Sequence, residues 1–573
     1  MERRAANIAP ARLLPKVRKM PAMPLVTRLR LAVFVLVPLA LASCGGGGGG
    51  GGFSFFPLSP GGNNPPPAAD AKYTVGGSVS GLLGSGLVLQ LAGSADVAVA
   101  ADGAFVFSQK LAKGTSYAVS VKQQPSTPLQ TCTVNNPSGT IGDADIANVA
   151  VVCATTAQKV SVAVTGLDVA GGLVLQNNAG DDLAVNADGT FSFTTPVAVG
   201  ADYGVTVKTQ PTALQVCIAK QAFGTVTTAP VAAVTIACTT PGADRFAFTA
   251  DEGTSSVSMY IVGSDGSLSS VGRFPAGGTP QHVTTHPSKP YIYASNISGA
   301  TRGVIQYAID TTTVPTGTLT QQRAITAGVG TTPYFVGIAP NGQHAYVIGD
   351  GMLHRLDVDA NTGDLTGGTA VAGGTSRKIG LDPQGRFAFV VVNSTSLATF
   401  RLDPATGEPI SPPASVVLPS NSGLTDIAIE PTGRFAYANV GNNPGTLLAY
   451  SIDATTGALT QIGSVPAGDT PFGMAVDPSG RFLYAANRNS NNVSAYSIDP
   501  RTGALTPVPG QPFAAGSVPN SVTVDRTGRF AYSANQADNT ITVFTIDRTT
   551  GSLGTGVSLP STGGGPQFLA LTK

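Results

Sequence analysis

Side chains that can do acid–base chemistry gather at one position of a repeat in the second half of the chain. Two residues stand before each of seven similar strands, and they differ between copies while the framework around them stays alike. These pairs are Gln281-His282, Tyr334-Phe335, Arg377-Lys378, Thr425-Asp426, Phe472-Gly473, Asn520-Ser521 and Gln567-Phe568. Framework positions repeat because every copy packs in the same way. Unlike residues on equivalent loops are therefore the positions where a site could be built. His282 with Arg377 and Lys378 would combine a base with cations that hold an oxyanion.

A second loop of each repeat is expected at the same end of the domain. It contributes charged residues, namely Asp251, Glu252, Arg302, Asp350, Arg488 and Asp538. From both sets we select as candidate ligand-binding residues Lys378, Asp426, Arg302, Tyr334 and Arg488. The structural alternative for His282 is a polar loop residue without a partner. His286 precedes Pro287 in a turn and is predicted to be structural.

The element that must position these residues is a repeat of about 45 to 50 residues. Its clearest copy, Asp477–Thr506, reads as three short strands joined by two turns. One aligned position recurs seven times, at Phe246, Tyr291, His344, Phe387, Phe435, Phe482 and Phe530. A four-stranded unit with this period is typical of a β-propeller blade. The strand before each Gly-Arg-Phe turn, such as Pro471–Val476, is predicted to be innermost.

The two ends of the repeat region indicate how the ring closes. No inner-strand sequence precedes Asp244, whereas Pro566–Thr572 looks like an inner strand without the rest of its blade. We expect this segment to complete the first blade and so to pair both open edges. The predicted fold class is all-β, with a C-terminal seven-bladed β-propeller (244–573) preceded by two small antiparallel β-sandwich modules.

Residues 73–154 and 158–240 form a tandem repeat of short strands that alternate apolar and polar residues. The sequence GLVLQ, for example, occurs in both units. Apart from Cys44 the chain has four cysteines, at equivalent positions of the two units. The simplest of the three connectivities pairs Cys132 with Cys153 and Cys217 with Cys238. A zinc site is the rival interpretation, but the chain has no CxxC motif. The units resemble Ig-like or carboxypeptidase-regulatory-like sandwiches and are expected to act as spacers.

The first 43 residues have the pattern of a targeting segment. Arg28 and Arg30 precede the apolar run Leu31–Ala42, which is typical of a secretory signal peptide. Leu41–Cys44 resembles the bacterial lipobox, which implies that Cys44 is lipidated; the alternative is an ordinary signal peptide with a chance cysteine. Residues 44–72 are rich in glycine and proline and are predicted to be a flexible tether. The residue after Cys44 is a glycine rather than an aspartate, and in this the sequence resembles lipoproteins that are sorted to the outer membrane of Gram-negative bacteria.

The charge distribution narrows the class of partner. The targeting segment holds eight of the 33 lysines and arginines and one acidic residue, so the rest of the chain is net acidic. A mildly acidic protein without a basic stripe is a poor candidate for nucleic-acid binding. We expect a monomer that is attached to the membrane through Cys44 and that binds a protein, glycan or small-molecule ligand.

The repeat phrases P-x-G-R-F-x-Y-x-x-N and I-D-x-x-T-G-x-L-T make the region from Asp244 to Lys573 similar to the lactonase-type seven-bladed propeller family, which includes bacterial 6-phosphogluconolactonases. The resemblance implies lactone chemistry at the channel mouth by histidine, arginine and glutamate, without a cofactor or a metal ion. The segment TPQHVTTHP resembles the histidine-bearing segment of the family, which implies His282 and His286. Arg377 and Glu252 complete the candidate catalytic set by position alone.

Two functions remain open at this point. The first is a lipid-anchored cell-envelope protein whose propeller binds a protein, glycan or small molecule, and the stalk of modules favours it. The second is a hydrolase that opens a lactone ring, and the family resemblance favours it. Convergence of His282, Arg377 and an acid at the mouth would support the hydrolase. A flat mouth, or one filled by Phe335, Phe472 and Phe568, would support binding or scaffolding.

Overall fold

The computed structural model describes residues 71–572, apart from 169–171, 212–214, 243, 311, 313–316, 374–377, 393 and 419–422. The predicted lipidation site Cys44 and the predicted catalytic residue Arg377 lie outside the described residues. The described part of the chain is all-β and contains no α-helix, only the 3-10 turn η1 (Glu252–Thr254). No helical segment among those residues has the length and apolar character needed to cross a membrane.

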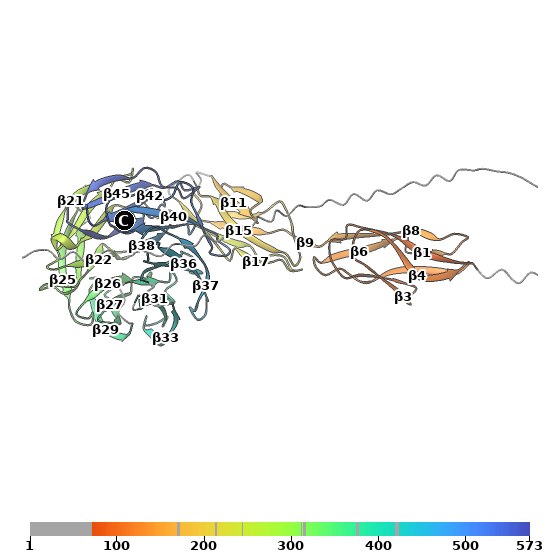
Figure 1. Cartoon of the computed structure of the whole chain (residues 1–573), viewed down its shortest axis with the longest axis horizontal. Coiled ribbons are helices and arrows are strands. Elements are labelled where there is room, and N and C mark those ends of the chain that lie inside the picture. Colours follow the sequence, from red (N-terminus) through yellow and green to blue (C-terminus); the bar gives the residue numbers. More distant parts are fainter. Residues whose placement is uncertain are drawn as a thin grey trace, which may run out of the picture. The chain divides into compact units, whose positions relative to one another are not determined.

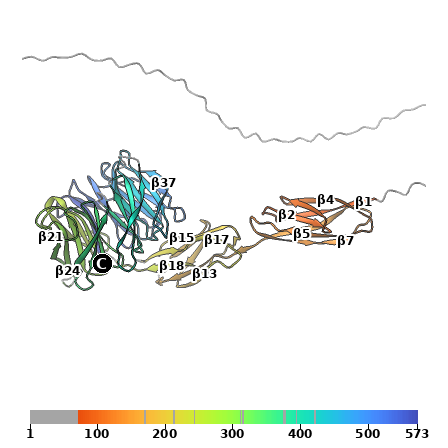
Figure 2. The same ribbon diagram turned by 90° about the horizontal axis from the view of Figure 1, so that it is seen from below.

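The first module is a sandwich of two sheets, with strand orders β4-β1-β8-β6 and β3-β2-β5-β7. Figure 2 shows them as two layers, with β1 and β4 in one and β5 and β7 in the other. Its strands are β1 (Lys72–Ser80), β2 (Leu87–Leu91), β3 (Ala95–Val99), β4 (Gly103–Ala112), β5 (Ser116–Gln123), β6 (Gln130–Asn135), β7 (Ser138–Thr140) and β8 (Ile146–Thr155). Every second residue of β2 is buried in the core between the sheets.

The second module repeats this arrangement, with strand orders β13-β10-β18-β16 and β12-β11-β15-β17. Its strands are β9 (Ala157–Gln158), β10 (Ser161–Thr165), β11 (Leu173–Asn177), β12 (Asp181–Val185), β13 (Gly189–Ser192), β14 (Val197–Ala198), β15 (Asp202–Thr209), β16 (Val216–Lys220), β17 (Phe223–Thr225) and β18 (Val234–Thr239). Both predicted disulfides are confirmed, and each joins directly opposed residues of an antiparallel strand pair. One pair in each module, β1 with β8 and β10 with β18, is parallel, so these sheets are mixed rather than wholly antiparallel.

The described residues from Phe246 to Thr572 form seven further sheets, which are the blades of a propeller. Blade 1 contains β19 (Phe246–Asp251), β20 (Ser256–Val262) and β21 (Leu268–Pro275). Blade 2 contains β22 (Pro280–Thr285), β23 (Tyr291–Asn296), β24 (Gly303–Asp310) and β25 (Thr318–Ile325). Blade 3 contains β26 (Pro333–Ile338), β27 (His344–Gly349), β28 (Met352–Val358) and β29 (Leu365–Ala372). Blades 4 and 5 contain β30 (Ile379–Leu381), β31 (Phe387–Val392), β32 (Ser396–Leu402), β33 (Pro409–Val417); β34 (Leu424–Ile429), β35 (Phe435–Val440), β36 (Thr446–Ile452) and β37 (Leu459–Pro466).

Blades 6 and 7 contain β38 (Pro471–Val476), β39 (Phe482–Asn487), β40 (Asn492–Ile498), β41 (Leu505–Pro507), β42 (Phe513–Ala514); β43 (Pro519–Val524), β44 (Phe530–Asn535), β45 (Thr540–Thr545) and β46 (Val557–Pro560). The last strand, β47 (Pro566–Thr572), pairs with β19 and completes blade 1, as predicted. Figure 1 shows the outer strands β21, β25, β29, β33 and β37 on the rim of the propeller. The seven aligned positions found in the sequence are the first residues of the second strands.

The repeated phrases are explained by bonds between neighbouring blades. In five blades the tyrosine two positions after the aligned residue, which in blades 5 to 7 belongs to the G-R-F-x-Y phrase, donates a hydrogen bond to the carbonyl oxygen of the glycine that ends a turn in the next blade. The bonds are Tyr293 to Gly363 (2.6 Å), Tyr346 to Gly407 (2.7 Å), Tyr437 to Gly503 (3.1 Å), Tyr484 to Gly551 (3.0 Å) and Tyr532 to Gly266 (3.0 Å). These tyrosines are fully or almost fully buried. The bonds therefore hold the blades in register around the ring and satisfy buried carbonyl groups.

The arginine of the same phrase fastens the next blade from the outside. Arg481 lies over the ring of Phe482, 5.1 Å from its centroid, and donates to the carbonyl oxygens of Arg548 and Thr549 at 3.0 and 3.1 Å. The turn that accepts these bonds ends at Gly551, whose φ of 77° favours glycine. A Cβ atom on this glycine would overlap the Phe482 ring. The phrase and the turn are thus two halves of one contact between blades.

Candidate functional site

The mouth of the propeller, the end where the inner strands begin, is built on β-bulges. The predicted site pairs lie inside the inner strands, except that Lys378 directly precedes β30, so their expected placement in loops is wrong. In blades 2, 3, 6 and 7 the pairing shifts at the first residue of the pair, for example between Pro280 and His282. A bulge adds one residue on one strand and re-aims its side chain. In these four blades the bulge therefore changes the direction of the side chains at the mouth.

The second residues of the pairs stand at equivalent positions of the seven blades, and we refer to them together as the central ring: His282, Phe335, Lys378, Asp426, Gly473, Ser521 and Phe568. The His282 imidazole lies against Phe335 of blade 3 with ring centroids 4.0 Å apart, and against Phe568 of blade 1 at 5.0 Å. The Lys378 ammonium lies 4.3 Å from the centroid of the Phe568 ring. Blades 1 to 4 therefore meet through side chains at the centre, and aromatic rings surround the histidine.

The fifth blade joins the central ring through an ion pair. Lys378 Nζ and Asp426 Oδ2 are 2.5 Å apart, and both side chains are buried. The backbone N–H of Met474 in blade 6 also donates to Asp426, at 2.7 Å. Burial lowers the pKa of Lys378 and raises the pKa of Asp426, and the ion pair opposes both shifts. The charge of this lysine is thus already balanced within the protein.

The surroundings of His282 keep its imidazole neutral. Burial between the aromatic rings, together with the nearby positive charge of Lys378, lowers the pKa of His282 to about 3. Its Nδ1 atom is buried and has no hydrogen-bond partner among the described residues. A general base works best when its pKa is near the operating pH. At neutral pH, His282 is therefore a weak base that presents a ring face and one unsatisfied nitrogen.

The other side of the mouth carries a chain of amide hydrogen bonds through blades 6, 7 and 1. Arg488 donates to Gln536 at 2.9 Å, and Asn520 donates to Gln536 at 3.1 Å and to Gln567 at 2.7 Å. Gln567 and Gln536 both donate to Glu252, Gln536 at 3.3 Å. The Arg488 guanidinium also lies over Phe472, 5.2 Å from its centroid. This amide chain joins a carboxylate to a guanidinium across three blades.

The structure brings together only part of the predicted site. His282, Lys378 and Asp426 meet in the central ring, whereas Glu252 and Arg488 belong to the amide chain. Arg302 is exposed beside β24. Tyr334 is half-buried in β26, and its carbonyl oxygen accepts a hydrogen bond from Ser295 at 3.1 Å.

One member of the amide chain was missed, although the sequence contains a signal for it. Gln536 follows the last residue of the second strand of blade 7, which is the position of Arg488 in blade 6 and of Glu252 in blade 1. The other predicted histidine, His286, accepts from two backbone N–H groups through Nδ1, and its Nε2 atom lies 3.1 Å from the carbonyl oxygen of Gly342. His286 is therefore a turn-forming residue, as predicted, and not part of the mouth.

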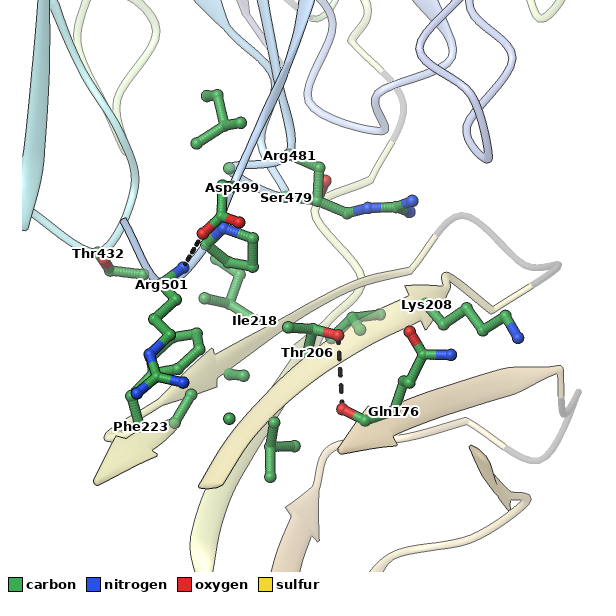
Figure 3. Close-up of a pocket in the computed structure, with 18 of the residues that line it drawn as sticks. Gln176, Thr206, Lys208, Ile218, Phe223, Thr432, Ser479, Arg481, Asp499 and Arg501 are labelled. Atoms are coloured by element: carbon green, nitrogen blue, oxygen red, sulfur yellow. Dashed lines mark hydrogen bonds between the residues drawn. The ribbon is translucent and has the colours of Figure 1, made fainter. Parts of the chain in front are cut away.

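A separate hollow of about 800 Å³ lies away from all these residues. Figure 3 shows its lining, with Thr206, Lys208 and Phe223 from strands of the second module and Ser479, Asp499 and Arg501 from turns of the propeller. Its charged side chains are of both signs, and Arg501 is paired with Asp202. The hollow is a gap between two packed surfaces rather than a pocket that focuses one kind of charge.

Comparison with known proteins gives the propeller region clear relatives. The family model described as "Lactonase, 7-bladed beta-propeller" matches residues 239–517 and 510–566. A 6-phosphogluconolactonase from Formosa agariphila is 47% identical over 70 residues, which are 12% of this chain and 20% of that protein. A 6-phosphogluconolactonase from Pectobacterium carotovorum subsp. carotovorum is 28% identical over 250 residues, which are 41% of this chain and 72% of that protein.

A solved structure agrees on the fold. The crystal structure of a candidate 6-phosphogluconolactonase from Bacteroides fragilis matches with a TM-score of 0.50 and 18% identity, over 58% of this chain and 99% of that chain. Identity at this level speaks for the fold alone. The residues of the mouth must therefore be judged by their own geometry.

Proposed function

Because the chain belongs to the seven-bladed β-propeller lactonase family, we propose that its propeller binds a small polar ligand at the mouth without hydrolysing it. The observation that carries this proposal is the packing of His282 between Phe335 and Phe568. The histidine that the family resemblance implies as catalytic is a weak base in this position, because its pKa is about 3.

The chemistry of the mouth suits a ligand with an apolar face and polar edges. Phe335, Phe472 and Phe568 are partly exposed and offer ring faces. The amide chain offers donors and acceptors beside them, and the Oδ1 atom of Asn520 is buried without a partner among the described residues. Small-molecule sites in general combine apolar walls with a few placed polar groups. A ring with several hydroxyl groups fits this description.

We also propose that the protein is exported and anchored at Cys44 to the outer membrane of a Gram-negative bacterium. The lipobox-like sequence around Cys44 and the glycine-rich segment after it support this placement. The expected result is that the native chain fractionates with membranes and that Cys44→Ser releases it. A Cys44→Ser chain that stays with the membranes would contradict the anchor.

A second candidate function is hydrolysis of a lactone, which the family and its named relatives favour. In that case Glu252 is the described residue best placed to activate water, and Arg488, joined to it through Gln536, is the cation that would stabilise the oxyanion. The family's histidine would then act without taking the proton.

One experiment separates the two functions. The purified chain is tested against a panel of γ- and δ-lactones that includes 6-phosphogluconolactone, and in parallel for a rise in Tm with the lactones and with the corresponding open-chain acids and sugars. Binding is indicated by a shift in Tm without turnover above the buffer rate. Turnover that falls in Glu252→Gln, with an unchanged Tm of the free variant, would establish the hydrolase instead.

A further inference from the structure

The propeller ring is closed by strand pairing and not by a covalent bond. The chain enters blade 1 at β19 directly after the second module, and the ring closes when β47 pairs with β19 from Phe246↔Thr572 to Asp251↔Pro566. Blades 7 and 1 are the two sides of this closure. Asp244, just before β19, reinforces it through Arg526 of blade 7, with Oδ1 and Nε 3.2 Å apart. Any further contact between the entering segment and the last blades would oppose opening of the ring.

The second module makes such contacts, first with blade 7. The Arg548 guanidinium, from the turn after β45, donates through Nη1 to the carbonyl oxygen of Pro211 at 3.0 Å. Through Nη2 it donates to the carbonyl oxygen of Gln215 at 2.5 Å. Both acceptors are backbone atoms beside β16 of the second module. Hydrogen bonds from a charged donor are stronger than neutral ones. Arg548 therefore makes the strongest contact between the second module and blade 7.

Blades 5 and 6 contribute two more arginines. The Arg434 guanidinium of blade 5 lies between two rings, 4.9 Å from the centroid of Phe223 in the second module and 4.8 Å from that of Phe435. Arg501 of blade 6 pairs with Asp202 of the second module. This last pair is about half exposed, so its own contribution is small. Three consecutive blades thus contact one module.

The first module is a natural control for these contacts. Asp202 and Phe223 are the first residues of β15 and β17, and the first residues of the equivalent strands β5 and β7 are Ser116 and Ser138. The register is the same, since Phe223 opposes Gly204 and Ser138 opposes Ala118. The acid and the aromatic ring that receive the propeller arginines are therefore specific to the second module, although the two modules share their fold.

We propose that the second module is a clamp that holds the propeller ring closed, while the first module is the spacer. The second module is joined covalently to β19 of blade 1 and non-covalently to blades 5, 6 and 7. It therefore connects the two sides of the ring closure, blade 1 and blade 7, independently of the β47–β19 pairing. The proposal gives the two modules different roles, although their similar sequences alone would predict the same role for both.

The first test measures proximity with a matched control. In the full chain carrying Cys44→Ser, Arg501→Cys is combined with either Asp202→Cys or Ser116→Cys, and a short bismaleimide is added. The other four cysteines are held in disulfides. The expected result is an intramolecular cross-link, seen by peptide mass spectrometry, for the Asp202→Cys pair and none for the Ser116→Cys pair. Equal cross-linking of both pairs, or none at Asp202→Cys, would overturn the docking.

The second test measures the clamp itself. Arg548→Ala is compared with Arg401→Ala, an exposed arginine on β32 of blade 4. Unfolding is followed by the near-ultraviolet signal of tyrosine, because eleven of the fourteen tyrosines lie in the propeller. Arg548→Ala is expected to lower the propeller Tm by roughly 2–4 °C, and Arg401→Ala to leave it unchanged. A cross-link at Asp202→Cys with an unchanged Tm for Arg548→Ala would show docking without clamping and refute the proposal.

Discussion

The hydroxyl group of Tyr484 in blade 6 donates a hydrogen bond of 3.0 Å to the carbonyl oxygen of Gly551 in blade 7. Four other pairs of blades are joined in the same way. A propeller has little other than side-chain contacts between its blades, because the backbone ladders run within each blade. These buried bonds are therefore the natural place to test what holds the ring together.

Removing the Tyr484 hydroxyl is expected to destabilise the propeller. Tyr484→Phe leaves the buried carbonyl of Gly551 without its donor, at a cost of about 1–2 kcal/mol in the free energy of unfolding. Tyr450→Phe is the matched control, since Tyr450 is fully buried but its hydroxyl has no partner among the described residues. That change is expected to be neutral or slightly stabilising. Urea unfolding of both variants measures the difference, and equal losses would refute the role of the bond.

The turn glycines are expected to be intolerant of any side chain. Gly503 has a φ of 73°, and a Cβ atom there would overlap the ring of Phe435 in the neighbouring blade. Gly503→Ala should therefore lower the free energy of unfolding by at least about 2 kcal/mol. Gly463 in β37 has open space around its Cβ position, so Gly463→Ala should change it by less than about 0.5 kcal/mol. A Gly503→Ala chain as stable as Gly463→Ala would contradict this account of the turn.

The central ion pair is expected to be costly to break and cheap to replace. Asp426→Asn leaves the buried Lys378 charge without its partner, which should cost about 3 kcal/mol of stability. The double variant Lys378→Met/Asp426→Asn removes the charge as well and keeps an acceptor for the Met474 N–H, so it should recover most of that loss. Chemical denaturation of the single and double variants checks this. A double variant no more stable than Asp426→Asn would mean that the pair stabilises the ring by itself.

His282 is expected to make the protein less stable as the pH falls. Its folded pKa is about 3 and its ordinary value is 6.5, so between these values the unfolded chain binds a proton that the folded chain does not. The stability should fall by about 1 kcal/mol for each pH unit below 6.

The variant His282→Gln isolates this contribution. Asp251 acts in the opposite sense, because burial raises its pKa to about 6, but it is present in both chains and cancels in the comparison. Unfolding curves between pH 7 and pH 4.5 should therefore show a shallower loss for His282→Gln than for the native chain. Parallel curves would mean that His282 is protonated as readily in the folded ring as in the unfolded chain.

The blades and the closure could be predicted because their residues recur for a physical reason. Phe482, Tyr484 and Gly551 recur because five of the seven blades make the same tyrosine contact with the next blade. The disulfide pairs could be predicted because two related modules show the same cysteine spacing. The parallel strand pair in each module could not, because β1 and β8 lie at opposite ends of the module and alternate in the same way under either direction.

The contacts between side chains of the central ring could not be predicted from the sequence. Lys378 and Phe568 meet because blades 4 and 1 face each other across the centre, and no spacing in the chain encodes that distance. The loss of basicity of His282 follows from the same packing, which places two rings and a cation around it. Residue type alone suggested a base at this position, and burial decides what the residue can do.

The pairing of β47 with β19 sets an order of events during synthesis. Blade 1 receives its first three strands before any other blade exists, and its fourth only after all the others have left the ribosome. Until then the edge of β19 offers unpaired N–H and C=O groups to any neighbouring strand. Completion of blade 1 therefore waits for the synthesis of β47, and a partly made propeller keeps this one edge open to other strands.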